Sequence, residues 1–380
     1  MSLDLDRVPD AFAASRDGTV GLEEEFAVLD PATLDLTPRF EELRDAAHHA
    51  DPLLADAIAG ELISSEVEIR SGRGEDFADA VERQRVARRR LFALGDQRAI
   101  ALGATGTHPW ADYREQHIID TEHYHRVEQG LKYVAWRNNT FSVHVHVGVH
   151  GADRAVRVCD RLRSVLPLLL AVSASSPFLE GNDTGLHSAR SQIFTKSFPR
   201  CGVPDAFGTW RAWADYVDLL VRTGSIVEFT QLWWSIRPHH DFGTVEVRIC
   251  DAQTTAAEAD ALAELIVACV RRAAEDVDAG ETPPDLPGRL IEENIWRAIR
   301  HGLDGRLLDL EAPRIDEFPA AETLDRLNAW AGAQVALPAL NGAQRQRRMI
   351  DAGAAPEDVY AASLAETQAT YFQETCDEPA

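Results

Sequence analysis

The chain has 380 residues, of which 45% are hydrophobic and 26% charged, and this composition indicates a folded globular protein and excludes a disordered one. Its formal net charge of -24 at pH 7 argues against nucleic-acid partners, because binding to phosphates needs a positive surface. The sequence has neither a signal-peptide pattern nor an apolar run near the ~20 residues that cross a membrane, so we expect a cytoplasmic protein without a membrane partner.

The first predicted strand, residues 18–29, contains three consecutive glutamates, Glu23, Glu24 and Glu25. Alternate side chains point to opposite faces of a strand, so Glu23 and Glu25 are neighbours on one face. Glu24 lies among the apolar residues of the other face, and we expect it either at the surface or paired with an arginine. The apolar face consists of Val20, Leu22, Phe26 and Val28.

Four later segments show the same alternation, with apolar residues on one face and polar residues on the other. Their polar faces present Ser64, Glu66, Glu68 and Arg70 in residues 61–72; Ser142, His144, His146 and His150 in residues 140–150; Gln231, Ser235 and Arg237 in residues 231–238; and Thr244, Glu246, Arg248 and Cys250 in residues 243–250. Apolar residues at helical spacing predict amphipathic helices over 75–98, 153–174 and 256–277. Turn residues predict a connection at 279–288 and a long loop region formed by 181–185 with 198–208.

These five strands, if they lie side by side in one antiparallel sheet, bring several charged side chains together. The set is Glu23, Glu25, Glu68, His146, Glu246, Arg237 and Arg248. Clustered carboxylates raise one another's pKa unless a cation lies among them, and carboxylates with one imidazole suit Mg²⁺ or Mn²⁺. Arginines bind phosphate or carboxylate oxygens, so metal with arginine indicates phosphoryl chemistry. A solvated strand face alternates in the same way, so the inference depends on the recurrence over five strands.

Several common sites are excluded by inspection. The chain contains no G-x-x-x-x-G-K-[ST], G-x-G-x-x-G, H-E-x-x-H, G-x-S-x-G or C-x-x-C sequence, and it has two lysines, Lys132 and Lys196. The histidines His117, His123 and His125 are expected on a helix surface. Residues 341–348, "NGAQRQRR", predict either a basic helix face or a phosphate contact, and both interpretations stay open.

A set of motifs follows in order from about residue 18 to residue 370. They include "GLEEEFAVLDP", "GELISSEVEIRSG", "HVHVGV", "SASSPFLEGNDTG", "SARSQIF", "IRPHHDFGTVEVRICD" and "NGAQRQR". As a set they resemble the bacterial carboxylate-amine ligases of the YbdK type, relatives of glutamate-cysteine ligase. The resemblance implies an α+β, glutamine-synthetase-like catalytic fold, with a curved antiparallel sheet that carries metal and nucleotide on one face and helices on the other. It also implies one ligase domain over residues 18–373, between an N-terminal extension, 1–17, and a C-terminal tail, 374–380.

The resemblance implies roles for particular residues. Glu23, Glu25, Glu68, His146 and Glu246 would bind the divalent ions, Mg²⁺ or Mn²⁺, that hold ATP. Glu246 and Arg248 would be catalytic, with Arg248 near the transferred phosphoryl group. Arg190, Arg237 and Arg345 would contact ATP phosphates or the substrate carboxylate. Ser235 stands where relatives often carry an acidic residue, which leaves the substrate open.

The implied reaction is ATP-dependent phosphorylation of a carboxylate, followed by attack of an amine on the acyl phosphate and release of ADP and phosphate. In a glutamate-cysteine ligase the carboxylate is the glutamate side chain and the amine is cysteine. The expected partners are these small molecules and a second copy in a homodimer. Glu23→Gln or Glu25→Gln is expected to abolish ATP turnover, and Glu24→Gln to affect neither turnover nor fold.

Two other functions are kept as alternatives. One is an ATP-dependent phosphotransferase on a small carboxylate or guanidino substrate, because one fold hosts many reactions. The other is a non-catalytic relative whose acidic sheet binds cations only.

Overall fold

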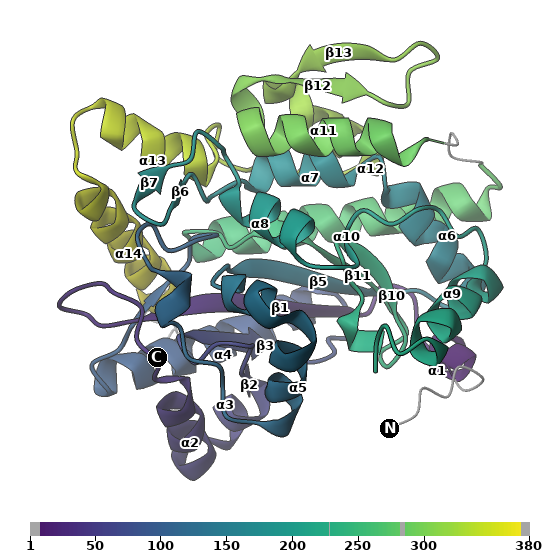
Figure 1. Ribbon diagram of the computed structural model, residues 1–380. Coiled ribbons are helices and arrows are strands. Elements are labelled where there is room, and N and C mark those ends of the chain that lie inside the picture. The colour runs from purple at the N-terminus through teal and green to yellow at the C-terminus, as the bar shows by residue number, and fades with distance from the viewer. Residues whose placement is uncertain (1–7, 228, 282–285, 374–380) are drawn as a thin grey trace, which may run out of the picture.

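An antiparallel sheet crosses the middle of the protein in the computed structural model, which describes residues 8–227, 229–281 and 286–373 (Figure 1). Within these residues the sheet has seven strands. They follow in the order β10 (Ile236–His239), β11 (Thr244–Asp251), β5 (Ser142–Gly148), β1 (Val20–Leu29), β3 (Glu66–Arg70) and β2 (Ile58–Ala59), and β4 (Ala101–Gly103) also pairs with β1. Four of the five segments predicted as strands form β1, β3, β5 and β11 of this sheet. The fifth, residues 231–238, is divided, because Trp233–Trp234 forms β9 in a separate pair with β8 and β10 of the central sheet begins at Ile236.

The remaining elements are helices and short strand pairs. The α-helices are α1 (Val8–Ala14), α2 (Phe40–Ala50), α3 (Pro52–Ala57), α4 (Phe77–Gln97), α5 (Glu122–Leu131), α6 (Ala152–Leu162), α7 (Leu166–Ser173), α8 (Ala189–Ser197), α9 (Trp210–Arg222), α10 (Ala256–Asp278), α11 (Gly288–His301), α12 (Thr323–Ala331), α13 (Gly342–Asp351) and α14 (Pro356–Gln373). The 3-10 helices are η1 (Tyr113–Glu115), η2 (Lys132–Arg137), η3 (Phe229–Gln231), η4 (Gly302–Asp304) and η5 (Ala320–Glu322). The short strands are β6 (Phe178–Leu179), β7 (Asn182–Asp183), β8 (Cys201–Gly202), β9 (Trp233–Trp234), β12 (Arg306–Asp309) and β13 (Asp316–Pro319).

The register of the sheet places the predicted polar residues opposite one another. Glu25 is opposite Glu68 across β1 and β3, Glu23 is opposite His144 across β1 and β5, and Glu246 is opposite His146 across β11 and β5. Side chains of directly opposed residues lie on the same face of a sheet. The strand parity predicted from the sequence is confirmed at these positions.

Helices cover the apolar face of the sheet. Val145 of β5 and Val247 of β11 belong to one buried cluster with Leu169 of α7 and Leu265 of α10. In Figure 1 α10 is drawn behind the strands and α5 in front of them. The short helices α5 and α8 contribute residues to the wall of a cavity that lies over the polar face. The predicted α+β class, with helices packed on one face of an antiparallel sheet, is confirmed.

The prediction of a single helix over residues 153–174 is wrong, because two helices, α6 and α7, occupy this range. Pro167 lies in the first turn of α7, where its missing N–H leaves no bond unmade. Inside one continuous helix the same proline would remove a hydrogen bond and clash with the preceding turn.

Cys250 was predicted on the polar face, and it is instead fully buried in the hydrophobic core. The register between β11 and β5 shifts between Val247 and Cys250, so that Val247 pairs with Val145 and Cys250 pairs with Val143. The extra residue in β11 is a β-bulge, which reverses the alternation beyond it.

The predicted domain limits stay predictions. On the N-terminal side of residue 18, helix α1 places Phe12 fully buried in the main core. The predicted tail, residues 374–380, lies outside the described residues.

The mid-chain region predicted as a loop contains the short strands β7 and β8. In the described part of the chain, no helix has the length and apolar character needed to cross a membrane.

Candidate active site

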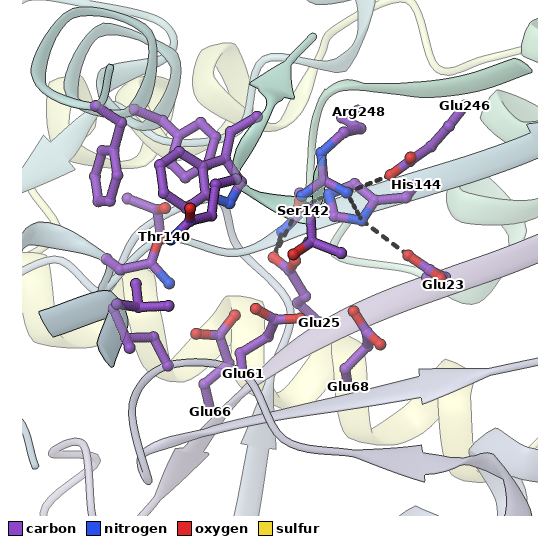
Figure 2. Close-up of a pocket in the computed structure, with 18 of the residues that line it drawn as sticks. Glu23, Glu25, Glu61, Glu66, Glu68, Thr140, Ser142, His144, Glu246 and Arg248 are labelled. Atoms are coloured by element: carbon purple, nitrogen blue, oxygen red, sulfur yellow. Dashed lines mark hydrogen bonds and ion pairs between the residues drawn. The ribbon is translucent and has the colours of Figure 1, made fainter. Parts of the chain in front are cut away.

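A cavity of about 340 Å³ lies over the polar face of the central sheet, lined by residues of β1, β3, β5, β10 and β11. Figure 2 shows four carboxylates, Glu25, Glu61, Glu66 and Glu68, gathered on one side with Arg248 above them. We call these four residues the acidic cluster. A sheet that buries so many charges on one face needs partners for them.

All five residues predicted to bind metal line this cavity: Glu23, Glu25, Glu68, His146 and Glu246. Among the described residues, possible ligand atoms of these five residues and of His144 and Glu61 form three groups, and within each group the atoms lie within 4.8 Å of one another. The groups are Glu23 with Glu68 and His144, Glu23 with His146 and Glu246, and Glu25 with Glu61 and Glu68. The structure thus brings the predicted set together, while its role in binding metal stays a prediction.

Three further residues of the site, His144, Glu61 and Glu66, were not among the predicted metal ligands. His144 and Glu66 share the strand parity of His146 and Glu68, so the alternation alone could have included them. Glu61 precedes β3 in an irregular segment, where no alternation indicates the direction of a side chain.

Burial and mutual repulsion dominate the acidic cluster. Burial, together with the nearby Glu25 carboxylate, raises the pKa of Glu66 well above its usual value and also raises that of Glu61. Burial and Glu23 raise the pKa of Glu68 well above its usual value. Burial also raises the pKa of Glu25, even though Arg190 opposes this and Ser142 donates two hydrogen bonds of 2.6 Å to it. Ionised together, these carboxylates are unstable without a cation.

The pKa values of Glu246 and Glu23 are lowered, whereas those of the acidic cluster are raised. Burial opposes the ionisation of Glu246, but Arg237 and Arg248 outweigh it and hold its pKa well below the usual value. For Glu23, burial is outweighed by His146 and His144, and the pKa is again well below the usual value. These two carboxylates are therefore charged in the folded protein.

The predicted arginines differ in how many partners they already have. Arg237 Nε donates to Glu246 Oε2 at 2.5 Å, and its Nη1 donates to the Leu232 carbonyl at 2.7 Å. Arg248 also pairs with Glu246 through Nη1, but its buried Nε has no hydrogen-bond partner among the described residues. Arg237 is thus committed to the protein, and Arg248 retains a donor for a ligand.

Arg190 lies in the first turn of helix α8 and lines the same cavity. Its Nη1 lies 3.6 Å from Asp251 and donates to the Ile249 carbonyl at 3.1 Å. Within the part of the chain that the structure describes, its buried Nε has no hydrogen-bond partner. Asp251 is completely buried and accepts bonds of 2.6 Å from Ser176 and 2.9 Å from Ser188. The serines hold Asp251, and Asp251 in turn holds Arg190.

Arg345 does not line the cavity, contrary to the predicted contact with ATP or substrate. It lies on α13, where Nη1 is 2.6 Å from Glu258 Oε1, and Nη1 also donates to the Leu340 carbonyl at 2.8 Å. Of the two interpretations left open for residues 341–348, the helix face describes its position.

Glu24 lies on the opposite face of the sheet and is 3% exposed. Arg88 Nε donates to its Oε2 at 2.6 Å, and Gln84 donates to the same oxygen at 2.8 Å. Pairing with an arginine is confirmed, and the surface alternative is wrong. Because Glu24 belongs to a buried ion pair, it is a structural residue. Glu24→Gln is therefore expected to lower the stability of the fold, and the earlier expectation that it leaves the fold unaffected is revised.

The donor set fits a divalent cation. Among the described residues, two buried atoms of the cavity wall, His146 Nε2 and Glu66 Oε2, have no hydrogen-bond partner, and His146 Nε2 lies 3.4 Å from Glu23 Oε1. An imidazole nitrogen and several carboxylate oxygens suit Mg²⁺ or Mn²⁺, and a cation would relieve the repulsion within the acidic cluster.

Known sequences match this chain over most of its length. The model of the family described as glutamate-cysteine ligase family 2 (GCS2) matches residues 19–374. "Putative glutamate--cysteine ligase 2-2" of Rubrobacter xylanophilus is 41% identical over 318 residues, which are 83% of this chain and 80% of that protein. "Putative glutamate--cysteine ligase 2" of Gloeobacter violaceus is 36% identical over 352 residues, 89% of this chain and 94% of that protein.

Solved structures share the fold at low sequence identity. A bifunctional glutathione synthetase from Pasteurella multocida has a TM-score of 0.65 at 12% identity over 97% of this chain, and the match spans 54% of that longer protein. A glutamate-cysteine ligase from Francisella tularensis, solved with AMP, has a TM-score of 0.62 at 13% identity and covers 96% of this chain and 91% of its own. These likenesses confirm the predicted glutamine-synthetase-like fold class.

Proposed function

The chain belongs to glutamate-cysteine ligase family 2, whose members are ATP-dependent ligases that form a C–N bond, and on this premise we propose that it joins the side-chain carboxylate of glutamate to an amine such as cysteine. The observation that carries the proposal is the cavity in which the acidic cluster faces Arg190 and Arg248. Carboxylates that need a cation and arginines with unused donors are what phosphoryl transfer to a carboxylate requires.

The proposed reaction has two steps. A carboxylate oxygen of glutamate attacks the γ-phosphorus of ATP, the bond between that phosphorus and the β–γ bridging oxygen breaks, and ADP leaves. The amine lone pair then attacks the acyl carbon, the bond from that carbon to the phosphate oxygen breaks, and phosphate leaves while the nitrogen loses a proton. The product is an amide, so atoms and charges balance without an oxidant or reductant.

We assign the divalent cation, Mg²⁺ or Mn²⁺, to Glu23, Glu25, Glu68, His146 and Glu246. Such a cation, when bound, neutralises phosphate charge and polarises the γ-phosphoryl group. The three groups of ligand atoms support this assignment, and they add His144 and Glu61 to the residues that could take part. The low pKa of Glu246, which Arg237 and Arg248 maintain against burial, keeps this ligand ionised.

The two arginines with an unpartnered Nε, Arg248 and Arg190, receive the anions of the reaction in this proposal. In this proposal Arg248, which already pairs with Glu246, offsets the charge that develops on the transferred phosphoryl group. Arg190 is held by Asp251 at 3.6 Å and binds the substrate carboxylate or a phosphate. We assign Arg237 a positioning role on Glu246, because each of its three nitrogens has a protein partner.

The base of the nucleotide is assigned to a neighbouring hollow of about 310 Å³, which shares Glu23 and His146 with the cavity. Its walls include Val20 and Phe242, and the Phe242 ring is 60% exposed and stacked on His239, with ring centroids 4.4 Å apart. An exposed flat ring and apolar walls suit a nucleobase. Because the hollow and the cavity share Glu23, this assignment is consistent with phosphates that lie toward the cation.

The test is ADP release from Mg²⁺-ATP and L-glutamate, with and without amines. Hydroxylamine is added in a parallel reaction, because it converts an acyl phosphate to a stable hydroxamate. We expect release that depends on both glutamate and an amine, and hydroxamate when hydroxylamine is the only amine. Sustained release with glutamate alone would favour the phosphotransferase, and no nucleotide binding with any metal would favour the cation-binding relative.

A further inference from the structure

One end of the cavity is apolar, and the assignments proposed above for ATP and glutamate leave it unused. Phe194 of α8, Phe198 and Trp233 of β9 line this end, which we call the aromatic end. Val127 and Leu131 of α5 line the cavity as well. Figure 2 draws a group of aromatic rings beside Thr140, on the far side of the cavity from Glu23.

The three rings of the aromatic end are packed against one another. Phe194 and Phe198 are stacked, with centroids 4.8 Å apart and ring planes at 29°. Phe198 and Trp233 meet edge to face at 6.1 Å and 80°. Arg200 holds its guanidinium 5.8 Å from the Trp233 ring centroid. Contacts of this kind restrain the rings, so the aromatic end is a preformed surface.

The aromatic end lies directly beside the groups assigned to phosphoryl transfer. Phe194 and Trp233 line one small hollow together with Arg190 and Arg248. The Arg190 guanidinium is 6.0 Å from the Phe194 ring centroid. A substrate whose reacting atom lies near Arg248 therefore has ring surface within reach of its side chain.

We propose that the amine acceptor carries a bulky apolar side chain that packs against Phe194, Phe198 and Trp233. This inference rests on the proposed ligase reaction. Glutamate and the phosphates need charged partners, and the nucleobase is assigned to the neighbouring hollow, so the acceptor is the substrate left for the apolar surface. A thiol as small as that of cysteine leaves most of this surface in water, and each further buried methylene changes kcat/KM by about 10- to 200-fold.

The first experiment compares acceptors in the ADP-release assay with Mg²⁺-ATP and L-glutamate. The panel is L-phenylalanine, L-leucine, L-cysteine and L-alanine. We expect kcat/KM for L-phenylalanine or L-leucine to exceed that for L-cysteine and L-alanine by about tenfold or more. A preference for L-cysteine or L-alanine overturns the inference while the ligase stands.

A second measurement separates failure of this inference from failure of the proposed function. Calorimetry measures binding of the same amines in the presence of Mg²⁺ and a non-hydrolysable ATP analogue, so it does not depend on turnover. If no amine stimulates ADP release, the ligase fails, and binding alone then decides the role of the aromatic end. Tighter binding of L-phenylalanine than of L-alanine supports it, and equal, reversed or undetectable binding overturns it.

Variants locate the effect on the aromatic end. Phe194 is partly exposed on the short helix α8, and we expect Phe194→Ala to lower kcat/KM for the apolar amine about tenfold or more, with the KM for ATP within about twofold. Phe194→Leu keeps apolar bulk and should restore most of the loss. Trp233→Leu is the second variant, and Trp296→Ala is the matched control, because Trp296 is 45% exposed on α11 away from the cavity wall. Loss of activity with all acceptors alike in both Phe194→Ala and Trp233→Leu would overturn the inference.

Discussion

Two clusters of buried charge lie on opposite faces of the central sheet, and they differ in how their charges are balanced. On the helix-covered face, Arg88 pairs with Glu24 at 2.6 Å and with Asp260 at 2.7 Å, and Arg85 also pairs with Asp260 at 3.0 Å. Tyr371 adds a hydrogen bond to Glu24 at 3.3 Å. Two arginines thus meet two carboxylates.

On the cavity face, the acidic cluster has more negative charge than its partners neutralise. Arg70 pairs with Glu68, but Glu66 Oε2 is buried without a hydrogen bond, and burial together with Glu25 raises the pKa of Glu66 well above its usual value. A buried cluster whose positive and negative charges balance needs no ligand, whereas a cluster with excess negative charge requires a bound cation. The contrast assigns structure to one face and ligand binding to the other.

The largest expected effect is on activity, from Glu23→Gln. Glu23 belongs to two of the three groups of ligand atoms, so its loss removes a charge that holds the cation. We expect ADP release to fall by at least about 10³-fold, which corresponds to roughly 4 kcal/mol of lost transition-state stabilisation. Circular dichroism should stay close to the parent spectrum, and the metal-free Tm should fall less than in Glu24→Gln, because the Glu23 side chain is 14% exposed and that of Glu24 is 4% exposed. Activity within tenfold of the parent protein would remove Glu23 from the site.

Glu24→Gln should have the reverse signature. The substitution leaves Arg88 buried at 2% exposure without its full partner charge, and breaking a buried pair costs about 3–5 kcal/mol. Urea unfolding measures this as a lower free energy of unfolding. The kcat of the protein that remains folded should be unchanged, and a selective loss of kcat at parental stability would contradict the separation of the two faces.

The stability conferred by Mg²⁺ should depend on pH. Burial, with Glu25 for Glu66 and Glu23 for Glu68, raises the folded-state pKa of both carboxyls well above the usual value of a glutamate. The stability that the Glu66 and Glu68 carboxyls contribute is therefore present at pH values below their pKa in the unfolded chain. It is lost as the pH rises through their pKa in the folded protein. Glu246, whose pKa is lowered against burial mainly by Arg237, contributes stability above its unfolded pKa that is lost only in acid.

Mg²⁺ should offset the loss at high pH, and at 100 times its Kd it would stabilise the fold by about 2.7 kcal/mol. The measurement is Tm with Mg²⁺ and with EDTA at about pH 5 and pH 8, and the difference should be larger at pH 8. Glu68→Gln should reduce it, because this variant removes a charge shared by two ligand groups. An equal Mg²⁺ effect at both pH values would contradict the assignment.

The smallest effect is expected for Arg345→Ala. Arg345, on α13, pairs with Glu258 of α10, and its side chain is 27% exposed. We therefore expect a loss of about 1 kcal/mol or less and an unchanged KM for ATP. An ATP titration of the variant provides the check. A KM raised tenfold would restore the phosphate contact predicted from the sequence.

The sequence by itself determined the strands and the direction of their side chains. The alternation in β1, β3, β5 and β11 places Glu23, Glu25, Glu68, His146 and Glu246 on one face, and the register of the sheet agrees. This was possible because the two-residue period of a strand is a local property, set by backbone geometry and not by distant contacts. The same property separates Glu24 from its two neighbours.

Tertiary structure decided what local patterns do not contain. The bulge in β11 turned Cys250 into the core, and the irregular segment before β3 brought Glu61 to the cavity. Asp251 directed Arg190 into the cavity from a residue 61 positions away in the chain, and Glu258 drew Arg345 out of it. Each of these depends on which distant segments pack together, because the partner of a long charged side chain is fixed by the folded neighbourhood and not by sequence spacing.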